Sequence, residues 1–194
     1  MRSSPTVIRS QDFDEFRDWE LAHGVEADRR QLSRGRAVFE AGFAAFGELF
    51  VMRYRARERW LTEYALPKGV VEISFGRYPD PPNWCAVELP PAFVAIQLGG
   101  RDYRAVLAGG EAYCVVFPES MAIRWGLIPE EILSRATSHK HAAAPAASDM
   151  LDCTMQTIDA LFASDGYLPE TVAQEAILSG CKDLVDTCYS QRMK

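Results

Sequence analysis

The feature that most constrains this chain is the regular alternation of short apolar runs and turn residues between Glu26 and Gly126. The runs are rich in β-branched and aromatic residues, which favour strands. They cover Val38–Phe46, Leu49–Trp60, Val70–Phe75, Phe93–Leu98, Ala112–Val116 and Met121–Trp125. The turn formers between them are Gly47, Pro67-Lys-Gly69, Tyr78–Pro82, Gly99-Gly100, Gly109-Gly110 and Pro118. Strands at this spacing predict a β-sandwich or small barrel rather than βαβ units.

Helical patterns lie on both sides of this β-rich region. Asp12 has the spacing of an N-cap and begins a helix that ends near Gly24, and Pro129 begins a short second helix. The Ala-rich stretch His139–Ser148 is low in complexity and predicts a linker. Apolar residues at helical spacing then predict one helix before Pro169 and another after it. Such a pair forms an antiparallel hairpin, which must bury its apolar side against the β-rich region or another subunit.

Composition and charge are those of an ordinary folded domain with one unusual region. The 194 residues are 48% hydrophobic and 25% charged, and a net charge of −6 argues against a broad DNA-binding surface. The chain has 17 Arg but only 4 Lys, and eight of the arginines lie between Arg29 and Arg59 against three glutamates. This concentration predicts a local anion site.

The sequence also predicts a cytoplasmic protein. Its apolar runs are too short to cross a membrane, and the N-terminus becomes acidic where a signal peptide needs an apolar core. The five cysteines include no C-x-x-C motif, and most lie in apolar stretches, as buried thiols in a reducing compartment do.

Two segments hold most of the arginines. The segment Arg29–Arg36 has four guanidinium groups in eight residues and contains a glycine. In the other segment, Arg53, Arg55, Arg57 and Arg59 recur at every second position, so in a strand they share one face. Guanidinium groups bind phosphate or the edge of guanine with paired hydrogen bonds, and they stack on bases. The alternative is a solvated strand face in an arginine-rich protein.

No motif for enzymatic chemistry is present. The sequence contains no nucleophile elbow, P-loop or dinucleotide-binding fingerprint. His139-x-His141 has the spacing of a metal-binding pair, but Ala-rich sequence follows where a third ligand is needed. We therefore expect neither an enzyme nor a metal site.

Several short motifs resemble the N-terminal effector-sensing domain of AraC-type transcription regulators. They are Asp12–Phe16, Gln31-Leu-Ser-x-Gly35, and Ala65-Leu-Pro-x-Gly69 before a strand that ends in Ser74-Phe75-Gly76. The resemblance implies a mainly β protein: a cupin-like β-barrel with an N-terminal helix and a C-terminal antiparallel helical hairpin. Residues 1–138 are then the N-terminal arm and barrel sensor, 139–148 a linker and 149–194 a helical dimerisation segment. The helix-turn-helix DNA-binding domain of such regulators is not expected in this chain.

Arg30 and Arg34 form an R-x-x-x-R motif directly ahead of the predicted barrel. It looks like the motif with which PilZ domains hold cyclic di-GMP, and the CuxR-type branch of AraC-type regulators is similar in combining it with a cupin-like barrel. The resemblance implies that cyclic di-GMP is the effector and that it promotes homodimerisation through the C-terminal helices, and with it DNA binding by the full-length protein. No other cofactor is implied. The implied ligand-binding residues are Arg30, Gln31, Ser33, Arg34 and Arg36, with Arg29, Arg55, Arg57 and Ser74 as further candidates.

The second PilZ motif, [D/N]-x-S-x-x-G, has only an incomplete match in Glu72-Ile-Ser-Phe-Gly76, which is one residue short. One alternative keeps the sensor role but places a sugar or an aromatic acid inside the barrel. Aromatic side chains would then form the walls of the site, and the candidates are Trp60, Trp84, Tyr103 and Trp125. A cupin enzyme is an alternative from another class, and it would need a metal triad.

Overall fold

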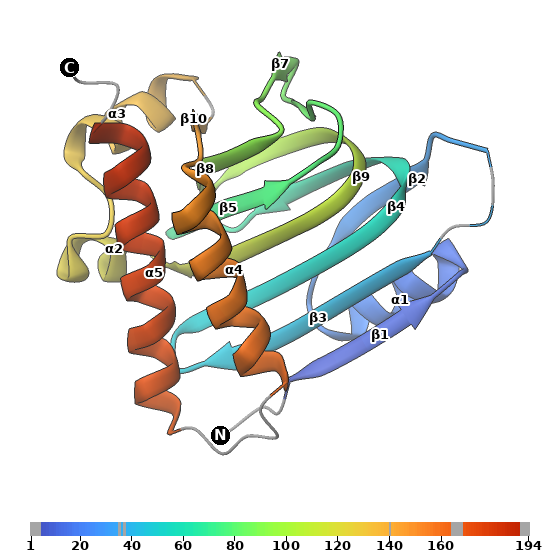
Figure 1. The fold of residues 1–194 in the computed structure, drawn as a ribbon, viewed down its shortest axis with the longest axis horizontal. Coiled ribbons are helices and arrows are strands. Elements are labelled where there is room, and N and C mark those ends of the chain that lie inside the picture. The colour runs from blue at the N-terminus through green and yellow to red at the C-terminus, as the bar shows by residue number, and fades with distance from the viewer. Residues whose placement is uncertain (1–4, 35, 37, 140, 164–168, 191–194) are drawn as a thin grey trace.

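The computed structural model describes residues 5–34, 36, 38–139, 141–163 and 169–190 (Figure 1). The strands are β1 (Thr6–Ser10), β2 (Ala27–Gln31), β3 (Phe39–Phe46), β4 (Leu49–Leu66), β5 (Val70–Arg77), β6 (Asn83–Trp84), β7 (Val87–Glu88), β8 (Ala92–Leu98), β9 (Arg101–Pro118) and β10 (His141–Pro145). The helices are α1 (Phe13–Ala22), α2 (Glu119–Trp125), α3 (Glu130–His139), α4 (Ser148–Ala163) and α5 (Glu170–Ser190).

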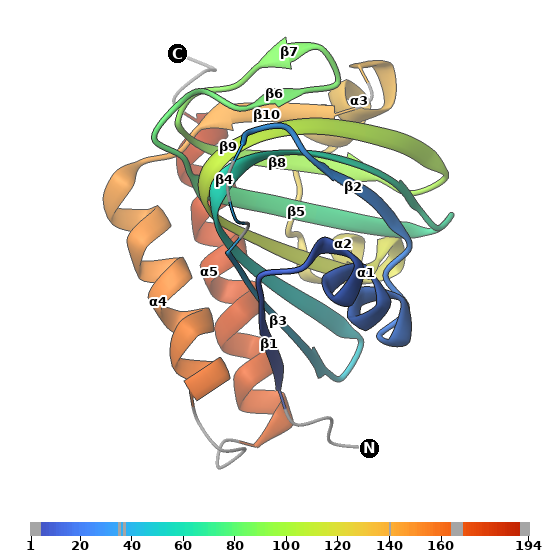
Figure 2. The same ribbon diagram turned by 90° about the vertical axis from the view of Figure 1, so that its right-hand side faces the viewer.

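The strands form one antiparallel sheet in the order β1-β3-β4-β9-β5-β8-β10, and β2 pairs with the second half of β4. The long strands β4 and β9, of 18 residues each, pair along nearly their whole length. The sheet curls, with α4 and α5 on one side and α1 on the other (Figure 2). In the described part of the chain, no pairing joins β1 to β10. The predicted mainly β fold with an N-terminal helix and a C-terminal helix pair is confirmed, whereas closure into a barrel is not shown.

The turns follow the sequence in most places but not at Gly109-Gly110. Gly47, between β3 and β4, and Gly69, between β4 and β5, have positive φ in tight hairpins, as expected. Gly109 instead lies inside β9, opposite a β-bulge where the register of β4 shifts between Ala56 and Arg59. A Cβ at Gly109 would overlap the backbone oxygen of Arg57. The glycine therefore permits a close approach of two strands and does not end one.

Two elements differ from the predictions. Met121–Trp125, predicted as a strand, belongs to helix α2, which begins directly after Pro118 and ends at left-handed Gly126. The predicted linker His139–Ser148 contains β10, which pairs with β8. Its alanines are small enough to be buried between the sheet edge and α5, where the Tyr189 hydroxyl donates to the carbonyl of Ala142 (2.8 Å). The division into sensor and dimerisation segments stays a prediction.

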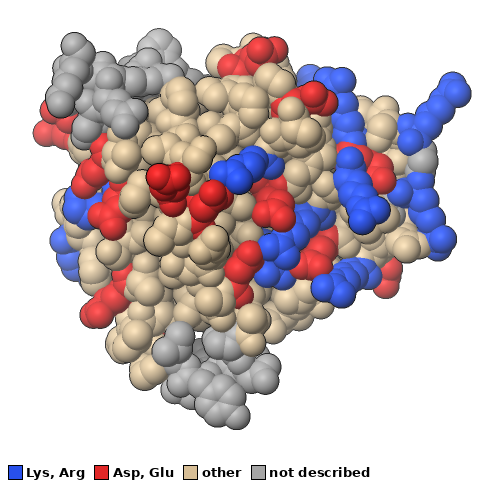
Figure 3. Space-filling model, viewed as in Figure 1, with Lys and Arg blue, Asp and Glu red and all other residues tan. Residues whose placement is uncertain are grey.

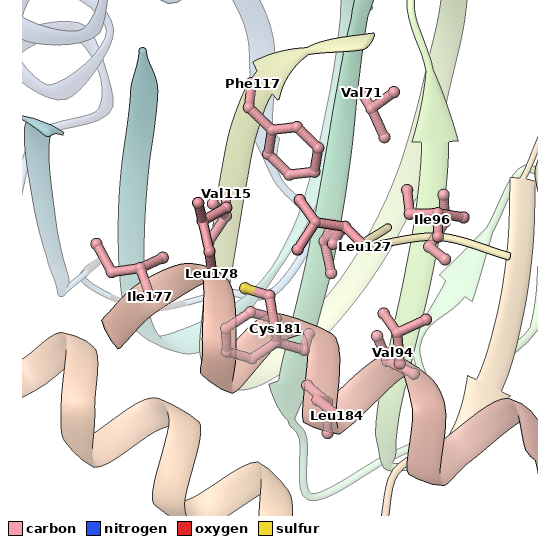
Figure 4. Packing of buried hydrophobic residues seen from close by; sticks show 14 of the residues in the cluster. Val71, Val94, Ile96, Val115, Phe117, Leu127, Ile177, Leu178, Cys181 and Leu184 are labelled. Carbon is pink, nitrogen blue, oxygen red and sulfur yellow. The ribbon is translucent and has the colours of Figure 1, made fainter. Parts of the chain in front are cut away.

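Each face of the sheet has its own hydrophobic core. On one face, α5 packs Ile177, Leu178, Cys181 and Leu184 against residues of β5, β8 and β9, including Val115 (Figure 4). The other face holds an aromatic cluster that includes Trp60 of β4, and α1 contributes its buried Phe16 to this cluster. Asp12 caps α1 by accepting from the backbone N–H groups of Asp14 and Glu15, as predicted. Among the described residues, no helix has the length and apolar character to cross a bilayer.

Candidate functional site

The two neighbouring arginines of β2 point in opposite directions, as the period of a strand requires. The side chain of Arg29 is 7% exposed and that of Arg30 is 64% exposed. Arg29 is part of the aromatic interior of the sheet, whereas Arg30 faces solvent. The predicted arginine segment is therefore divided between two environments.

Arg29 is held rigidly by an ion pair with α1. Its Nε and Nη2 atoms donate to the two carboxylate oxygens of Glu20, both at 2.6 Å, and Nη1 donates to the Thr62 hydroxyl at 2.8 Å. The guanidinium carbon lies 4.8 Å from the ring centroid of Tyr54 and 4.9 Å from that of Trp60. Burial alone would lower the pKa of Arg29, but the Glu20 carboxylate raises it above its ordinary value. Arg29 is therefore a charged group whose charge is already balanced.

The residues after Arg30 are fixed to β4 through their backbone. The N–H groups of Leu32 and Ser33 donate to the carbonyl of Arg59 at 2.8 and 3.4 Å, and the Ser33 hydroxyl accepts from the Arg59 N–H at 3.1 Å. The Gln31 side chain donates to the Ser33 carbonyl at 2.7 Å. These contacts use the side chains of Gln31 and Ser33 to shape the loop.

The guanidinium groups of this loop point outward. Arg34 and Arg36 are exposed, and Arg30 forms an ion pair of 2.6 Å with the half-exposed Asp28. Figure 3 shows Lys and Arg side chains gathered on the side of the molecule where β1 to β4 lie. Gly35, in the middle of the predicted motif, lies outside the described residues.

The arginines of β4 do not form one free cationic face. Arg53 and Arg55 both point toward α4, where the Asp159 carboxylate accepts from Arg53 at 2.9 Å and from Arg55 at 2.7 Å. Glu40 is a second partner of both. Arg57, which lies in the bulge between Ala56 and Arg59, is exposed. Arg55, a candidate ligand-binding residue, is thus engaged at the interface between sheet and helix.

A cavity of about 410 Å³ lies on the concave face of the sheet. Its walls are mainly apolar, and the aromatic side chains among them include Tyr54, Trp60, Tyr78, Trp84 and Phe93. Cavities of this size commonly hold small organic molecules. The alternation of β4 brings Met52, Tyr54, Trp60, Thr62 and Tyr64 to this side.

A buried polar cluster forms one side of the cavity. The Ser74 hydroxyl donates to Glu72, and the Gln97 amide donates to Ser74 (3.0 Å) and to Glu72 (3.3 Å). The Tyr64 hydroxyl donates to the Gln97 oxygen at 2.6 Å. Burial raises the pKa of Glu72, and hydrogen bonds, first of all from Ser74, oppose that shift. The candidate residue Ser74 therefore lies in the cavity and not beside the exposed arginines.

The prediction of aromatic residues that line the site is correct for two of the four candidates. Trp60 and Trp84 line the cavity, but Tyr103 and Trp125 do not. The Tyr103 hydroxyl exchanges hydrogen bonds with the backbone of Leu98, and Trp125 is partly exposed on α2. Sequence reasoning missed Tyr78, because it follows β5 in a stretch that predicts only a turn.

In the described part of the chain, no group of three His, Cys, Asp or Glu side chains is placed to hold a metal ion. The side chains of the His139-x-His141 pair lie outside the described residues. The expectation that this pair does not hold a metal ion therefore stays a prediction.

The chain is thus a curved antiparallel sheet that borders a cavity on one face and carries a helix pair on the other. The crystal structure of the AraC-like transcriptional activator CuxR aligns with 96% of this chain and 70% of its own, with a TM-score of 0.62 and 13% sequence identity. No protein-family model and no curated protein matches the sequence. At this identity the likeness shows a common fold, and it supports the cupin-like architecture that the motifs imply.

Proposed function

We propose that this chain is the effector-sensing domain of an AraC-like transcription regulator and that it binds cyclic di-GMP through Arg30 and Arg34. The observation that carries the ligand assignment is the loop after β2. Its arginines face solvent while its backbone is tied to β4 by the contacts of Leu32 and Ser33. A fixed backbone with exposed guanidinium groups suits a dianionic ligand, because little ordering is needed on binding. The shared fold with an AraC-like activator supports the regulatory role.

The roles of the side chains follow from their chemistry. Arg30 and Arg34 stack on the guanine bases and bind their Hoogsteen edges or the phosphates. Arg36 adds charge, while Gln31 and Ser33 maintain the loop. Bound ligand favours a homodimer through the C-terminal helices, so that two DNA-binding domains occupy paired half-sites.

Isothermal titration with cyclic di-GMP tests this function. Arg30→Ala and Arg34→Ala are each expected to weaken binding by about ten-fold or more, as the loss of a bidentate contact does. Arg124→Ala is the control, because this exposed arginine of α2 pairs with Glu48 and lies outside the loop. No binding by the unaltered protein, or equal losses in the control, would refute the assignment.

Asp28 provides a second, opposite test. It competes for Arg30 in the free protein through their ion pair of 2.6 Å. Because an exposed pair contributes less than about 1 kcal/mol, Asp28→Asn should strengthen binding of cyclic di-GMP by no more than about five-fold. A weaker affinity in this variant would contradict the proposed role of Arg30.

A second candidate site is the cavity on the concave face, where a small effector would bind inside the sheet. The specific observation in its favour is the lining of the cavity, which includes the aromatic side chains of Trp60, Tyr78 and Trp84. Thermal-shift measurements with sugars and aromatic acids test this site, because a ligand that binds the folded protein raises its melting temperature.

A further inference from the structure

The described arginines differ in whether a carboxylate balances their charge. Most of them form ion pairs, as Arg53 and Arg55 do with Asp159. Four exposed arginines have no ion pair with another described residue, and they are Arg34, Arg36, Arg57 and Arg59. Cations without a counter-charge repel one another and attract anions. Their position in the fold therefore shows where an anionic ligand is most favourable.

These four arginines belong to two segments that lie side by side. Along its length β4 pairs first with β3 and then with β2, and its bulge lies between the two pairings. The segment that joins β2 to β3 is tied to the bulge near both of its ends. The Leu32 N–H donates to the carbonyl of Arg59 at 2.8 Å. The Val38 N–H donates to the carboxylate of Glu58 at 3.0 Å. The arginines of the loop and those of the bulge are therefore neighbours.

Strand alternation places Arg30 and Arg59 on the same face of the sheet. Arg29 and Trp60 both line the cavity on the concave face. Because neighbouring side chains of a strand point to opposite faces, Arg30 and Arg59 point to the outer face. Lys and Arg side chains gather on this side of the molecule (Figure 3). Arg59 of β4 therefore shares the surface of the proposed ligand-binding arginine of β2.

The carboxylates of this neighbourhood already have partners. Asp28 pairs with Arg30 at 2.6 Å, and Glu58 accepts from a backbone N–H. Glu63 pairs with Arg104 of β9 at 3.3 Å. None of the three forms an ion pair with the exposed arginines of the loop or the bulge. The surface therefore keeps an excess of positive charge, which a ligand with two phosphate groups would balance.

Two exposed apolar side chains accompany the arginines. Leu32 is 50% exposed and Val38 is 39% exposed, and both lie between β2 and β3. An inorganic anion gains nothing from such side chains, whereas a purine base can cover them and remove them from water. Cations beside exposed apolar groups therefore favour a nucleotide over bare phosphate.

We propose that Arg57 and Arg59 of the β4 bulge complete the cyclic di-GMP site by binding its phosphates, while Arg30 and Arg34 hold the guanine bases. This inference rests on the proposed function and adds a phosphate-binding half to the same site. A guanidinium group suits that role, because its planar fork donates two parallel hydrogen bonds to a phosphate. The site then consists of two segments that the backbone bonds of Arg59 hold together.

Calorimetric titration with cyclic di-GMP tests the assignment. Arg57→Ala and Arg59→Ala are each expected to weaken binding by about five-fold or more, because each removes a charged contact to phosphate. Lys68→Ala is the matched control, since this exposed cation follows the far end of β4 and its loss changes the net charge equally. It lies roughly 20 Å or more from Arg59 along the strand, so its loss should leave binding unchanged. Circular dichroism verifies that every variant is folded.

Salt dependence separates a phosphate contact from a structural effect. Raising the NaCl concentration from about 0.1 M to about 1 M shortens the Debye length from about 10 Å to about 3 Å. The unaltered protein should lose affinity over this range. Arg57→Ala and Arg59→Ala should each lose less, because one charged contact fewer remains to be screened. Pyrophosphate, which has the charges without the bases, should bind at least about ten-fold more weakly than cyclic di-GMP.

The outcomes distinguish this inference from the proposed function. If the variants of Arg30 and Arg34 weaken binding and those of the bulge arginines do not, only the inference is overturned. An unchanged salt dependence in the bulge variants, an equal loss in Lys68→Ala, or equally tight binding of pyrophosphate also overturns it. Losses in the bulge variants alone support the phosphate contacts and overturn the roles of Arg30 and Arg34. No binding of cyclic di-GMP by the unaltered protein overturns both proposals.

Discussion

Asp159 of α4 joins the helix pair to the sheet, and replacing it by asparagine is expected to destabilise the protein by about 2 kcal/mol. One carboxylate oxygen accepts from Arg53 (2.9 Å) and from the Tyr113 hydroxyl (3.0 Å), and the other accepts from Arg55 (2.7 Å). The asparagine side chain would keep the shape but lose the charge and one acceptor. The contact is the main polar link between α4 and β4.

The magnitude follows from the surroundings of these contacts. A hydrogen bond to a charged group contributes about 1.5–3 kcal/mol when buried, and an exposed ion pair contributes less than about 1 kcal/mol. Asp159 is 32% exposed, while Arg53 is largely buried, so the contacts lie between these limits. Both arginines keep Glu40 as a partner, at 2.8 Å from Arg53 and 3.4 Å from Arg55, which reduces the loss. About 2 kcal/mol corresponds to a melting temperature lower by roughly 4–8 °C for a chain of this size.

Urea denaturation followed by circular dichroism measures this effect. The control is Asp152→Asn on the same helix, because the ion pair of Asp152 with Arg77 (2.7 Å) joins side chains that are 43% and 47% exposed. That variant should lose less than about 1 kcal/mol. If Asp159→Asn lost no more free energy of unfolding than the control, the network would not hold α4, and the reasoning would be wrong.

Three further variants test the interior by urea denaturation. Arg29→Met leaves the Glu20 carboxylate buried without its cation and should lower the free energy of unfolding by about 3–5 kcal/mol. Adding Glu20→Gln to this variant should restore much of the loss, and a double variant whose loss equals the sum of the two single losses would contradict the reasoning. Because burial raises the pKa of Glu72, the unfolded chain releases this proton near its ordinary value of 4.5, before the folded chain does. The free energy of unfolding therefore falls as pH rises from that value through the folded pKa. Glu72→Gln should raise the free energy of unfolding more at about pH 8 than at about pH 4. An equal increase at both pH values would show that the pKa of Glu72 is not raised in the folded protein. Gly76→Ala should lose more than about 3 kcal/mol, because its Cβ would overlap the backbone oxygen of Glu111, and a loss under about 1 kcal/mol would show that the strands can separate there.

Much of the fold was predictable because local patterns and tertiary structure agree. The hairpin glycines, the Asp12 cap and the two C-terminal helices follow local rules that the rest of the molecule does not override. The sequence predicts strands shorter than β4 and β9 are, because charged residues such as Arg101 and Arg104 interrupt the apolar pattern of β9. Pairing with β4 satisfies the backbone there, whatever the hydrophobic pattern.

The candidate site was only partly predictable, for a different reason. Alternation predicts that Arg29 and Arg30 point apart, but which of them is buried depends on Glu20, which arrives from a separate helix. Likewise, the polar cluster around Ser74 forms because Gln97 of β8 meets it across the sheet, while Glu72 lies two residues before it on β5. The contacts of Arg29 with Glu20 and of Ser74 with Gln97 join different elements of the fold, and the periodicity of one strand does not encode them.

β4 connects the cavity to the helix pair, because successive side chains of a strand point to opposite faces. On the concave face, Tyr54 lines the cavity and donates to Glu20 at 3.0 Å. On the opposite face, its neighbours Arg53 and Arg55 bind Asp159 of α4. A ligand that shifts the backbone of β4 at Tyr54 therefore also moves both arginines, with no loop in between. The adjoining bulge is where a strand bends most readily, so such a shift would not have to distort the whole sheet. The strand β4 alone would then transmit the effect of a ligand in the cavity to the helix pair. Removing the ion pairs of Asp159 with Arg53 and Arg55 would interrupt this transmission.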